Sequence, residues 1–204
     1  MKVLLINGSA RKAGNTFTAL SEAARVLEEN GISTEIVQIG TMAQRGCIGC
    51  GGCKTRGGNK CVFDDDLCNR ISEKMSSCDG LIVGSPVYYG QPNGTLMSLI
   101  QRMLYSAGAS FSGKPVAAVA VCRRGGATAA LQTMLMPFQL LNMPIVTSQY
   151  WNIVYGRAEG EAALDAEGMQ TMRTMARNMA CLLKALQGQE KPEHECVTPM
   201  NFIR

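Results

Sequence analysis

Long apolar runs are missing from this sequence. No stretch approaches the ~18 consecutive apolar residues that would cross a bilayer. The apolar opening, residues 2–6, ends in a turn before it could form the core of a signal peptide. We therefore expect a soluble, cytoplasmic protein that has no membrane partner.

Histidine is nearly missing as well, because His194 is the only one and lies in a polar tail. This scarcity argues against a Ser-His-Asp triad and against histidine acid–base catalysis. An excess of one charge is also lacking: 20 basic and 16 acidic side chains give a net charge of +4, and no basic stripe is formed. Nucleic acid is therefore not an expected partner, whereas an anionic cofactor needs only a few local positive charges.

What the chain does contain suits one α/β domain. Its 204 residues are 46% hydrophobic and 18% charged, which is apolar enough to bury a core. Nine cysteines are many for such a chain. In a reducing compartment they are expected to be ligands, redox groups or buried thiols rather than disulfides.

Strand and helix patterns alternate along the sequence. The apolar patterns predict strands over 2–7, 32–39, 80–84, 116–122 and 144–148, and helices over 16–29, 66–77, 91–104, 127–141 and 162–187. Such alternation predicts a doubly wound, five-stranded parallel sheet of order 2-1-3-4-5 with helices on both faces. We expect one domain over 1–187 with a polar tail over 188–204. A Gly- and Cys-rich loop over 40–65 is inserted after the second strand, and a connection of this length normally carries function.

The turn after the first strand has the composition of a phosphate loop. Gly8 and Gly14 allow sharp backbone turns, while Arg11 and Lys12 add positive charge. Free N–H groups at the start of the next helix favour an anion. An ordinary strand-to-helix turn with a helix cap is the alternative, because Ser, Asn and Thr are also good caps.

Two further loops follow predicted strands at the same sheet edge. Residues 84–92 form a rigid turn that presents Tyr88 and Tyr89, and residues 122–127 are rich in arginine and glycine. A flat three-ring ligand needs an apolar or aromatic wall and backbone N–H groups around its polar edge. These loops supply both, although loop packing and a solvated edge would also explain them. Ligands of this fold bind outside the carboxyl ends of strands.

These motifs resemble those of a known family. Gly8-Ser9-x-Arg11-x-x-Gly14-Asn15-Thr16, together with Ser85-Pro86-Val87-Tyr88-Tyr89, is similar to the flavodoxin-like NADPH-dependent FMN reductase superfamily. The resemblance implies a flavodoxin-like fold that binds FMN through residues of three loops. The FMN-binding residues it implies are Ser9, Arg11, Asn15, Thr16 and Phe17 near the phosphate, Pro86, Val87, Tyr88 and Tyr89 beside the ring, and Arg123, Gly125 and Gly126 at its edge.

The 40–65 loop carries the spacing C-x2-C-x2-C-x7-C, formed by Cys47, Cys50, Cys53 and Cys61. Glycines between the cysteines let several thiolates converge and leave backbone N–H groups for sulfur, as a four-cysteine iron–sulfur site requires. The run resembles the motif of iron–sulfur flavoproteins, which implies a [4Fe–4S] cluster beside FMN. Zinc, or a loop of metal-free thiols, remains an alternative.

Other chemistry-bearing residues have simpler interpretations. The acids of residues 64–66 are expected to favour the start of the 66–77 helix through its dipole and cap. Buried packing is expected for a methionine stripe and four cysteines, namely Met169, Met172, Met175, Met179, Cys68, Cys78, Cys122 and Cys181. A dimer face is the second interpretation of the stripe. Trp151 could cap a flavin, and Cys196 has no assigned role.

The sequence thus favours an FMN-dependent oxidoreductase or electron-transfer flavoprotein. Electrons would pass from NAD(P)H or a ferredoxin-like carrier through FMN, with or without the cluster, to a small-molecule redox substrate or another acceptor. Flavin chemistry needs no protein base, which agrees with the scarcity of histidine. A redox-sensing module switched by the cysteine loop and an NADPH-dependent quinone or azo reductase are the alternatives. The resemblance also implies a homodimer or higher homo-oligomer.

Overall fold

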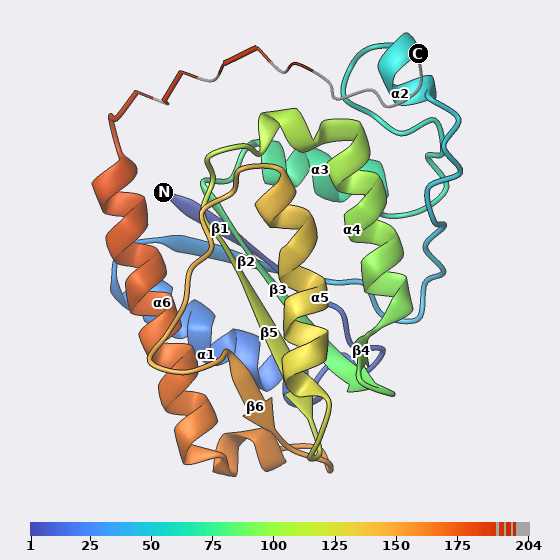
Figure 1. Cartoon of the computed structure of the whole chain (residues 1–204). Coiled ribbons are helices and arrows are strands. Elements are labelled where there is room, and N and C mark those ends of the chain that lie inside the picture. The colour runs from blue at the N-terminus through green and yellow to red at the C-terminus, as the bar shows by residue number, and fades with distance from the viewer. Residues whose placement is uncertain (191, 194, 197, 199–204) are drawn as a thin grey trace.

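The computed structural model describes residues 1–190, 192–193, 195–196 and 198 of the chain. It consists of a parallel sheet between two layers of helices (Figure 1). In chain order its elements are β1 (Lys2–Asn7), α1 (Asn15–Glu29), β2 (Ser33–Gln38), α2 (Gly52–Thr55), α3 (Cys68–Ser76), β3 (Gly80–Tyr88), β4 (Gln91–Pro92), α4 (Gly94–Ala107), η1 (Gly108–Ser110), β5 (Val116–Cys122), α5 (Ala127–Leu140), β6 (Ile153–Tyr155), η2 (Glu161–Leu164) and α6 (Ala166–Leu186). Within the described residues, no helix is both long and apolar enough to span a membrane.

The five parallel strands lie in the order β2-β1-β3-β5-β6. Counted without the two-residue β4, which forms a hairpin with the end of β3, this is the expected order 2-1-3-4-5. The register places Asn7 of β1 beside both Gln38 of β2 and Gly84 of β3. The loops after β1 and β2 therefore begin at one level of the same sheet edge, beside Gly84 of β3, which continues past them to Tyr88.

The prediction of a fifth strand over 144–148 is wrong in position. That segment forms one bridge, between Ile145 and Val116 at the start of β5. The chain then leaves the sheet and returns as β6, which pairs with residues 120–122 at the other end of β5. The apolar run at 144–148 therefore lies beside β5, which is the expected neighbour. The strand that reaches the carboxyl edge of the sheet, however, is the later β6.

Local turns explain the other shifts in element boundaries. The third strand continues past Gly84 to Tyr88 because its end pairs with β5 and β4. The helix expected from residue 91 begins at Gly94, where the N–H of Thr95 donates to the Asn93 side chain at 2.9 Å. The final helix is preceded by η2, and α6 begins after Asp165, which accepts the N–H of Gly168 at 3.0 Å.

Alternate side chains of each strand enter two separate apolar layers. On β1, Leu4 and Ile6 pack with α3, α4 and α5, whereas Val3 and Leu5 pack with α1 and α6. Both faces of the sheet are therefore covered, as its nearly continuous apolar strands predict. The four methionines of the stripe on α6 are buried in the second layer, which confirms their expected role in packing.

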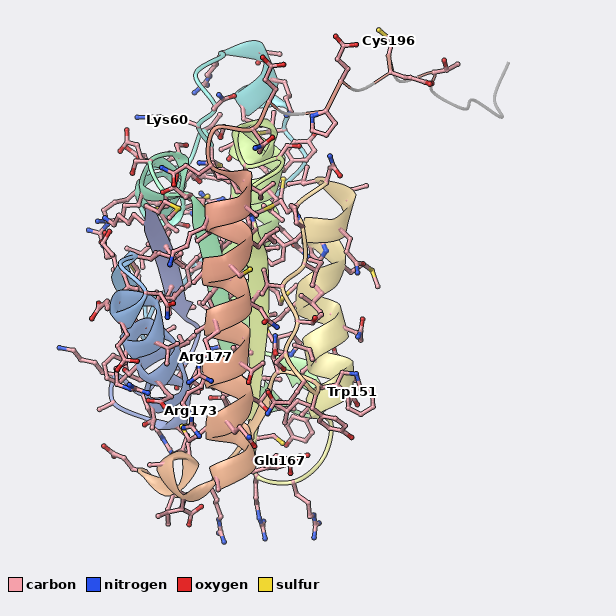
Figure 2. All side chains as sticks on the ribbon, turned by 90° about the vertical axis from the view of Figure 1, so that its left-hand side faces the viewer. Lys60, Trp151, Glu167, Arg173, Arg177 and Cys196 are labelled. Atoms are coloured by element: carbon pink, nitrogen blue, oxygen red, sulfur yellow. The ribbon has the colours of Figure 1, made fainter. Side chains whose placement is uncertain are left out.

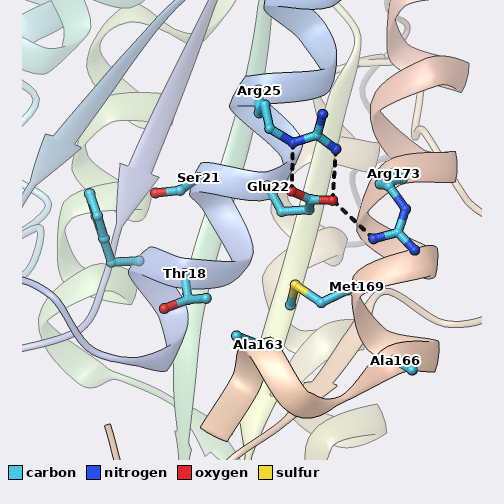
Figure 3. A pocket seen from close by; sticks show the side chains of 9 residues that line it. Thr18, Ser21, Glu22, Arg25, Ala163, Ala166, Met169 and Arg173 are labelled. Atoms are coloured by element: carbon cyan, nitrogen blue, oxygen red, sulfur yellow. Dashed lines mark hydrogen bonds and ion pairs between the residues drawn. The ribbon is translucent and has the colours of Figure 1, made fainter. Parts of the chain in front are cut away.

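A charged cluster joins α1 to α6 at the surface of this layer. Glu22 accepts from Arg25 Nε at 2.8 Å and from Arg173 Nη1 at 3.0 Å (Figure 3). These residues border a groove of about 580 Å³ between the two helices. The hydrogen bond from Arg25, followed by that from Arg173, lowers the pKa of Glu22 from 4.5 to about 2.

We predict that Glu22→Gln lowers the free energy of unfolding by about 1 kcal/mol at pH 7, a value reduced for solvent screening. Because the folded pKa is the lower one, the stabilisation is complete above pH 4.5. It is lost as the pH falls from 4.5 towards 2. Urea unfolding of the parent protein and of Glu22→Gln at several pH values measures this loss, because the two free energies of unfolding should become equal as the pH falls towards 2.

Glu29→Gln is the matched control, because Glu29 also pairs with Arg25 but is 58% exposed and its ion pair lies within α1. Glu29→Gln is expected to lower the free energy of unfolding at pH 7 by less than Glu22→Gln does. Equal effects of the two substitutions would contradict a special role of Glu22 in joining the helices.

Candidate functional site

The turn after β1 is held by hydrogen bonds to β3 and to the residue that caps α4. The N–H of Gly8 donates to the carbonyl of Gly84 at 2.8 Å, and the Asn93 side chain donates to the carbonyl of Gly8 at 2.7 Å. A Cβ on Gly8 would lie 2.8 Å from the Gly84 oxygen. Glycine at this position is therefore required by the close approach of two backbone segments.

Side chains at the strand ends fix the next residues of the turn. Asn7 accepts the N–H of Ser9 at 3.1 Å, and Gln38 donates to the Ser9 carbonyl. The Ser9 hydroxyl accepts the N–H of Arg11 at 3.1 Å. Helix α1 follows Gly14, and no side chain in the described part of the chain caps its start. Its first-turn N–H groups and positive dipole end therefore suit an anion.

A pocket of about 210 Å³ opens where these loops meet. It is lined by residues of all three predicted loops and by the loop after β6. The predicted residues that line it are Ser9, Arg11, Asn15, Thr16, Pro86, Val87, Tyr88 and Arg123. The pocket combines a helix start, arginines, and an apolar and aromatic wall, which are the parts needed by a flat ligand that carries a phosphate.

Four other predicted residues lie outside this lining. Phe17 faces the groove between α1 and α6, and Tyr89 is fully exposed. Gly125 and Gly126 belong to the turn that follows Arg123 in the chain, and neither glycine lines the pocket. A Cβ on Gly126 would lie 2.7 Å from Gly90 Cα, and Gly126 has a positive φ of 83°. Gly126 thus allows two of the pocket loops to touch.

Sequence reasoning missed Gly156 and Arg157, which complete the lining after β6. A strand placed at 153–155 would have revealed them, but the prediction placed the strand at 144–148. Asn15 contacts this same loop: its amide donates to the Ala158 carbonyl at 2.8 Å and accepts the N–H of Ala162 at 3.1 Å. Its side-chain oxygen and one amide hydrogen therefore hold the loop in position.

The aromatic residues before β6 form a separate feature. Tyr150 and Trp151 are 59% and 51% exposed, and their ring centroids lie 5.0 Å apart. Together with Tyr155 they border another pocket beside the start of α6. Figure 2 shows Trp151 on one side of α6 and Arg173 on the other.

The four cysteines of the motif line a second, smaller pocket beside α4. Cys47 and Cys50 are exposed, whereas Cys53 and Cys61 are half-buried. The apolar walls of this pocket include Ile48, Val62, Phe63 and Tyr105. The loop follows the outside of α4 to its far end, where α2 lies (Figure 1). Among the described residues, no three Cys, His, Asp or Glu side chains are close enough together to hold one metal ion.

Arg102 of α4 anchors this loop from inside. Its side chain is 1% exposed and forms an ion pair with Asp66, which is 4% exposed. Burial is the largest single influence on Asp66 and opposes its ionisation, but the hydrogen bonds from Arg102 and from the Cys68 and Arg45 backbones together outweigh it and hold the pKa of that carboxyl below its usual 3.8. Arg102 also donates to the carbonyl of Phe63 at 3.2 Å and to the Cys61 sulfur at 3.4 Å.

The acids before α3 have more specific roles than a general dipole effect. The helix begins at Cys68 rather than at residue 66, and Asp66 accepts the N–H of Cys68 at 3.0 Å while pairing with Arg102. Asp65 pairs with Arg45, and Asp64 accepts from Asn69 at 3.0 Å. The N-cap residue is Leu67, so none of the three acids is the cap, and Asp66 alone accepts a backbone N–H at the helix start.

The remaining cysteines divide into two groups. Cys68, Cys78 and Cys122 are buried as expected, and burial raises the pKa of the Cys68 thiol to about 11. The prediction that Cys181 is buried is wrong, because it lies on the exposed side of α6. Cys196 is also exposed, and His194 lies outside the described residues.

The sequence is similar to those of known proteins. A family model for NADPH-dependent FMN reductase matches residues 1–158. The chain belongs to this family. An iron-sulfur flavoprotein of Methanocaldococcus jannaschii is 34% identical over 194 residues, covering 91% of this chain and 99% of that protein. One from Methanosarcina thermophila is 32% identical over 193 residues, covering 92% and 97%. Within the FMN reductase family, the chain therefore falls in the iron–sulfur flavoprotein branch.

Solved structures confirm the flavodoxin-like fold. RosB, with a bound formylated riboflavin phosphate intermediate, superposes with a TM-score of 0.72 at 16% identity and covers 99% of this chain and 92% of its own. An archaeal flavodoxin gives 0.61 at 13% identity, covering 90% and 99%. As a member of the FMN reductase family, the chain is an FMN-dependent oxidoreductase.

We predict that Gly126→Ala weakens FMN binding by at least ~10-fold, equivalent to about 1.4 kcal/mol. The added Cβ would push the turn away from Gly90, and the positive φ would strain alanine. Quenching of flavin fluorescence during titration of the apoprotein measures the change.

Gly125→Ala is the control in the same turn, since a Cβ there meets nothing within 4 Å. Its affinity is expected to stay within about twofold of the parent protein. If both variants bound FMN equally well, close packing of the two loops would not matter for the site.

Proposed function

We propose that this flavoprotein transfers electrons between a reduced carrier and an acceptor through FMN and a [4Fe–4S] cluster. The observation that carries the proposal is the presence of two pockets with different chemistry on one fold. One pocket is built on the carboxyl edge of the sheet, and the other is lined by all four cysteines of the compact motif.

The first pocket offers suitable groups for each part of FMN. The start of α1, Ser9, Thr16 and the Arg11 guanidinium would hold the phosphate. Val87 and Tyr88 would cover the ring, and Arg123 would lie at its edge. FMN supplies the one- and two-electron chemistry when bound. The chain's part is to orient the ring and to surround it with fixed charges and dipoles.

The second pocket fits a cluster in its ligand chemistry. Four thiols border it, its walls are apolar, and a buried guanidinium faces the sulfur of Cys61. Gly49 and Gly51, with φ values of 66° and 69°, turn the chain between successive cysteines. A [4Fe–4S] cluster would take one thiolate for each iron, and these four cysteines supply that number of ligands.

The electron donor is proposed to be either NAD(P)H or a ferredoxin-like protein. Rates of FMN reduction with NADPH, NADH and reduced ferredoxin would distinguish them. A second candidate function, a redox sensor, is favoured by the exposure of Cys47 and Cys50, which leaves both thiols accessible to oxidants. Slow turnover with every donor, together with a structural change of the loop on oxidation, would support the sensor and contradict the enzyme.

We further propose that the chain assembles with a second copy. The cysteine pocket reaches Tyr105, about three turns or roughly 15 Å along α4 from the flavin edge, so a neighbouring copy could offer a shorter route between cofactors. The exposed aromatics Tyr150 and Trp151 provide an apolar contact. Sedimentation velocity should give a dimer or larger species, weakened by Trp151→Ser. A monomer at all concentrations would contradict this assembly.

The cluster is tested by Cys50→Ala, with Cys181→Ala as the control, because both cysteines are exposed but only Cys50 belongs to the motif. After anaerobic purification we expect about four iron and four sulfide per parent chain. The control should keep this content and Cys50→Ala should lose most of it, while both should retain the yellow flavin spectrum.

Two results would overturn parts of this function separately. Protein that stays colourless with added FMN would remove the flavin. Flavin-loaded protein without iron after reconstitution would remove the cluster, and bound zinc in its place would identify a structural site.

A further inference from the structure

Arg102 is among the largest side chains that are fully buried, although arginine is seldom buried without partners. It lies in the middle of α4 and faces the cysteine pocket instead of the flavin pocket. Removing a charge from water costs several kcal/mol unless hydrogen bonds and an opposite charge offset the loss. The contacts of the Arg102 guanidinium therefore show how the free-energy cost of its burial is offset and which segments it holds together.

The guanidinium bonds to both ends of the cysteine loop. Before the first cysteine it reaches the Arg45 carbonyl, 3.4 Å from Nη1. After the last cysteine it reaches the Phe63 carbonyl through Nη2 and the Asp66 carboxylate through Nη1. The rigid fork of arginine suits this role, because several donors in one plane contact separate segments at once. One side chain thereby closes the loop.

The third nitrogen of the Arg102 guanidinium, Nε, faces a cysteine of the motif. Nε lies 3.4 Å from the Cys61 sulfur, and the ring of Phe63 lies 5.6 Å from the centre of the guanidinium. Hydrogen bonds to ligating sulfur, and positive charge in a site shielded from water, stabilise the more negative, reduced state of a cluster. Asp66 balances the charge of Arg102, so Arg102 would act on a cluster through the hydrogen bond from Nε to the Cys61 sulfur.

We propose that Arg102 is a positioning residue for the cysteine site: it closes the loop and raises the reduction potential of a bound cluster through Cys61. The second part rests on the proposed function, since it requires the four cysteines to hold a cluster. The first part concerns the polypeptide alone and can be measured without iron.

Two variants and one control test this role. Arg102→Lys keeps the charge but cannot bridge the separate segments. Arg102→Met combined with Asp66→Leu removes both buried charges together, so that no unpaired carboxylate prevents folding. Arg45→Met is the control, because Arg45 lies on the same loop, 4.8 Å from the same Phe63 ring, but its side chain pairs with Asp65 at the surface.

In apoprotein, hydrogen exchange of residues 45–66 is expected to speed up at least ~10-fold in both Arg102 variants and to change little in the control. In reconstituted protein, a potentiometric titration followed by electron paramagnetic resonance should give a lower cluster potential in both variants. The FMN potential serves as the internal reference and should stay the same.

Each measurement tests a separate part of the proposed role of Arg102. Unchanged exchange in the Arg102 variants would overturn loop closure. A parent protein that binds a cluster, with the same potential in the variants, would overturn the tuning role and leave the proposed function intact. A parent protein that takes up no iron would overturn the tuning role together with the cluster.

Discussion

The parallel pairing of β1 with β2 and β3 is the constraint on which the flavin site depends. Because Asn7, Gln38 and Gly84 share one level of the sheet, the turn after β1 starts within hydrogen-bonding reach of both neighbouring strands. Gly8 then bonds to Gly84, while the Ser9 backbone bonds to Asn7 and Gln38. A phosphate-binding turn is thereby held in position by the backbone of the sheet, before any ligand is present.

Helix α4 connects this edge to the cysteine pocket. Asn93, at its start, caps the helix and donates to the carbonyl of Gly8. Three turns later, Arg102 and Tyr105 border the cysteine pocket. One rigid helix therefore contacts both candidate cofactor sites, and the Arg102–Asp66 pair attaches the long loop to it. The loop has little regular structure of its own, so its shape depends on this buried contact.

Much of the fold could be predicted because periodicity reports burial directly. Strands covered on both faces are apolar throughout, and the spacing of small and charged residues marks the helices. The fifth strand could not be placed in this way. Residues 144–148 and 153–155 are both apolar, and only pairing with the two ends of β5 decides which one reaches the functional edge. That ambiguity also concealed Gly156 and Arg157.

The sequence alone determined the chemistry available: a glycine-rich turn with arginine before a helix, an aromatic turn after a strand, and four cysteines at close spacing. These are local patterns, because the residues that act together are also neighbours in the chain. The tertiary structure decided which of them meet. It turned Phe17 and Tyr89 away from the pocket and left Cys181 exposed. It also brought Arg102 to Cys61 across 41 positions of the chain. Contacts between residues so far apart depend on how the helices pack on the sheet, and no local spacing records that packing.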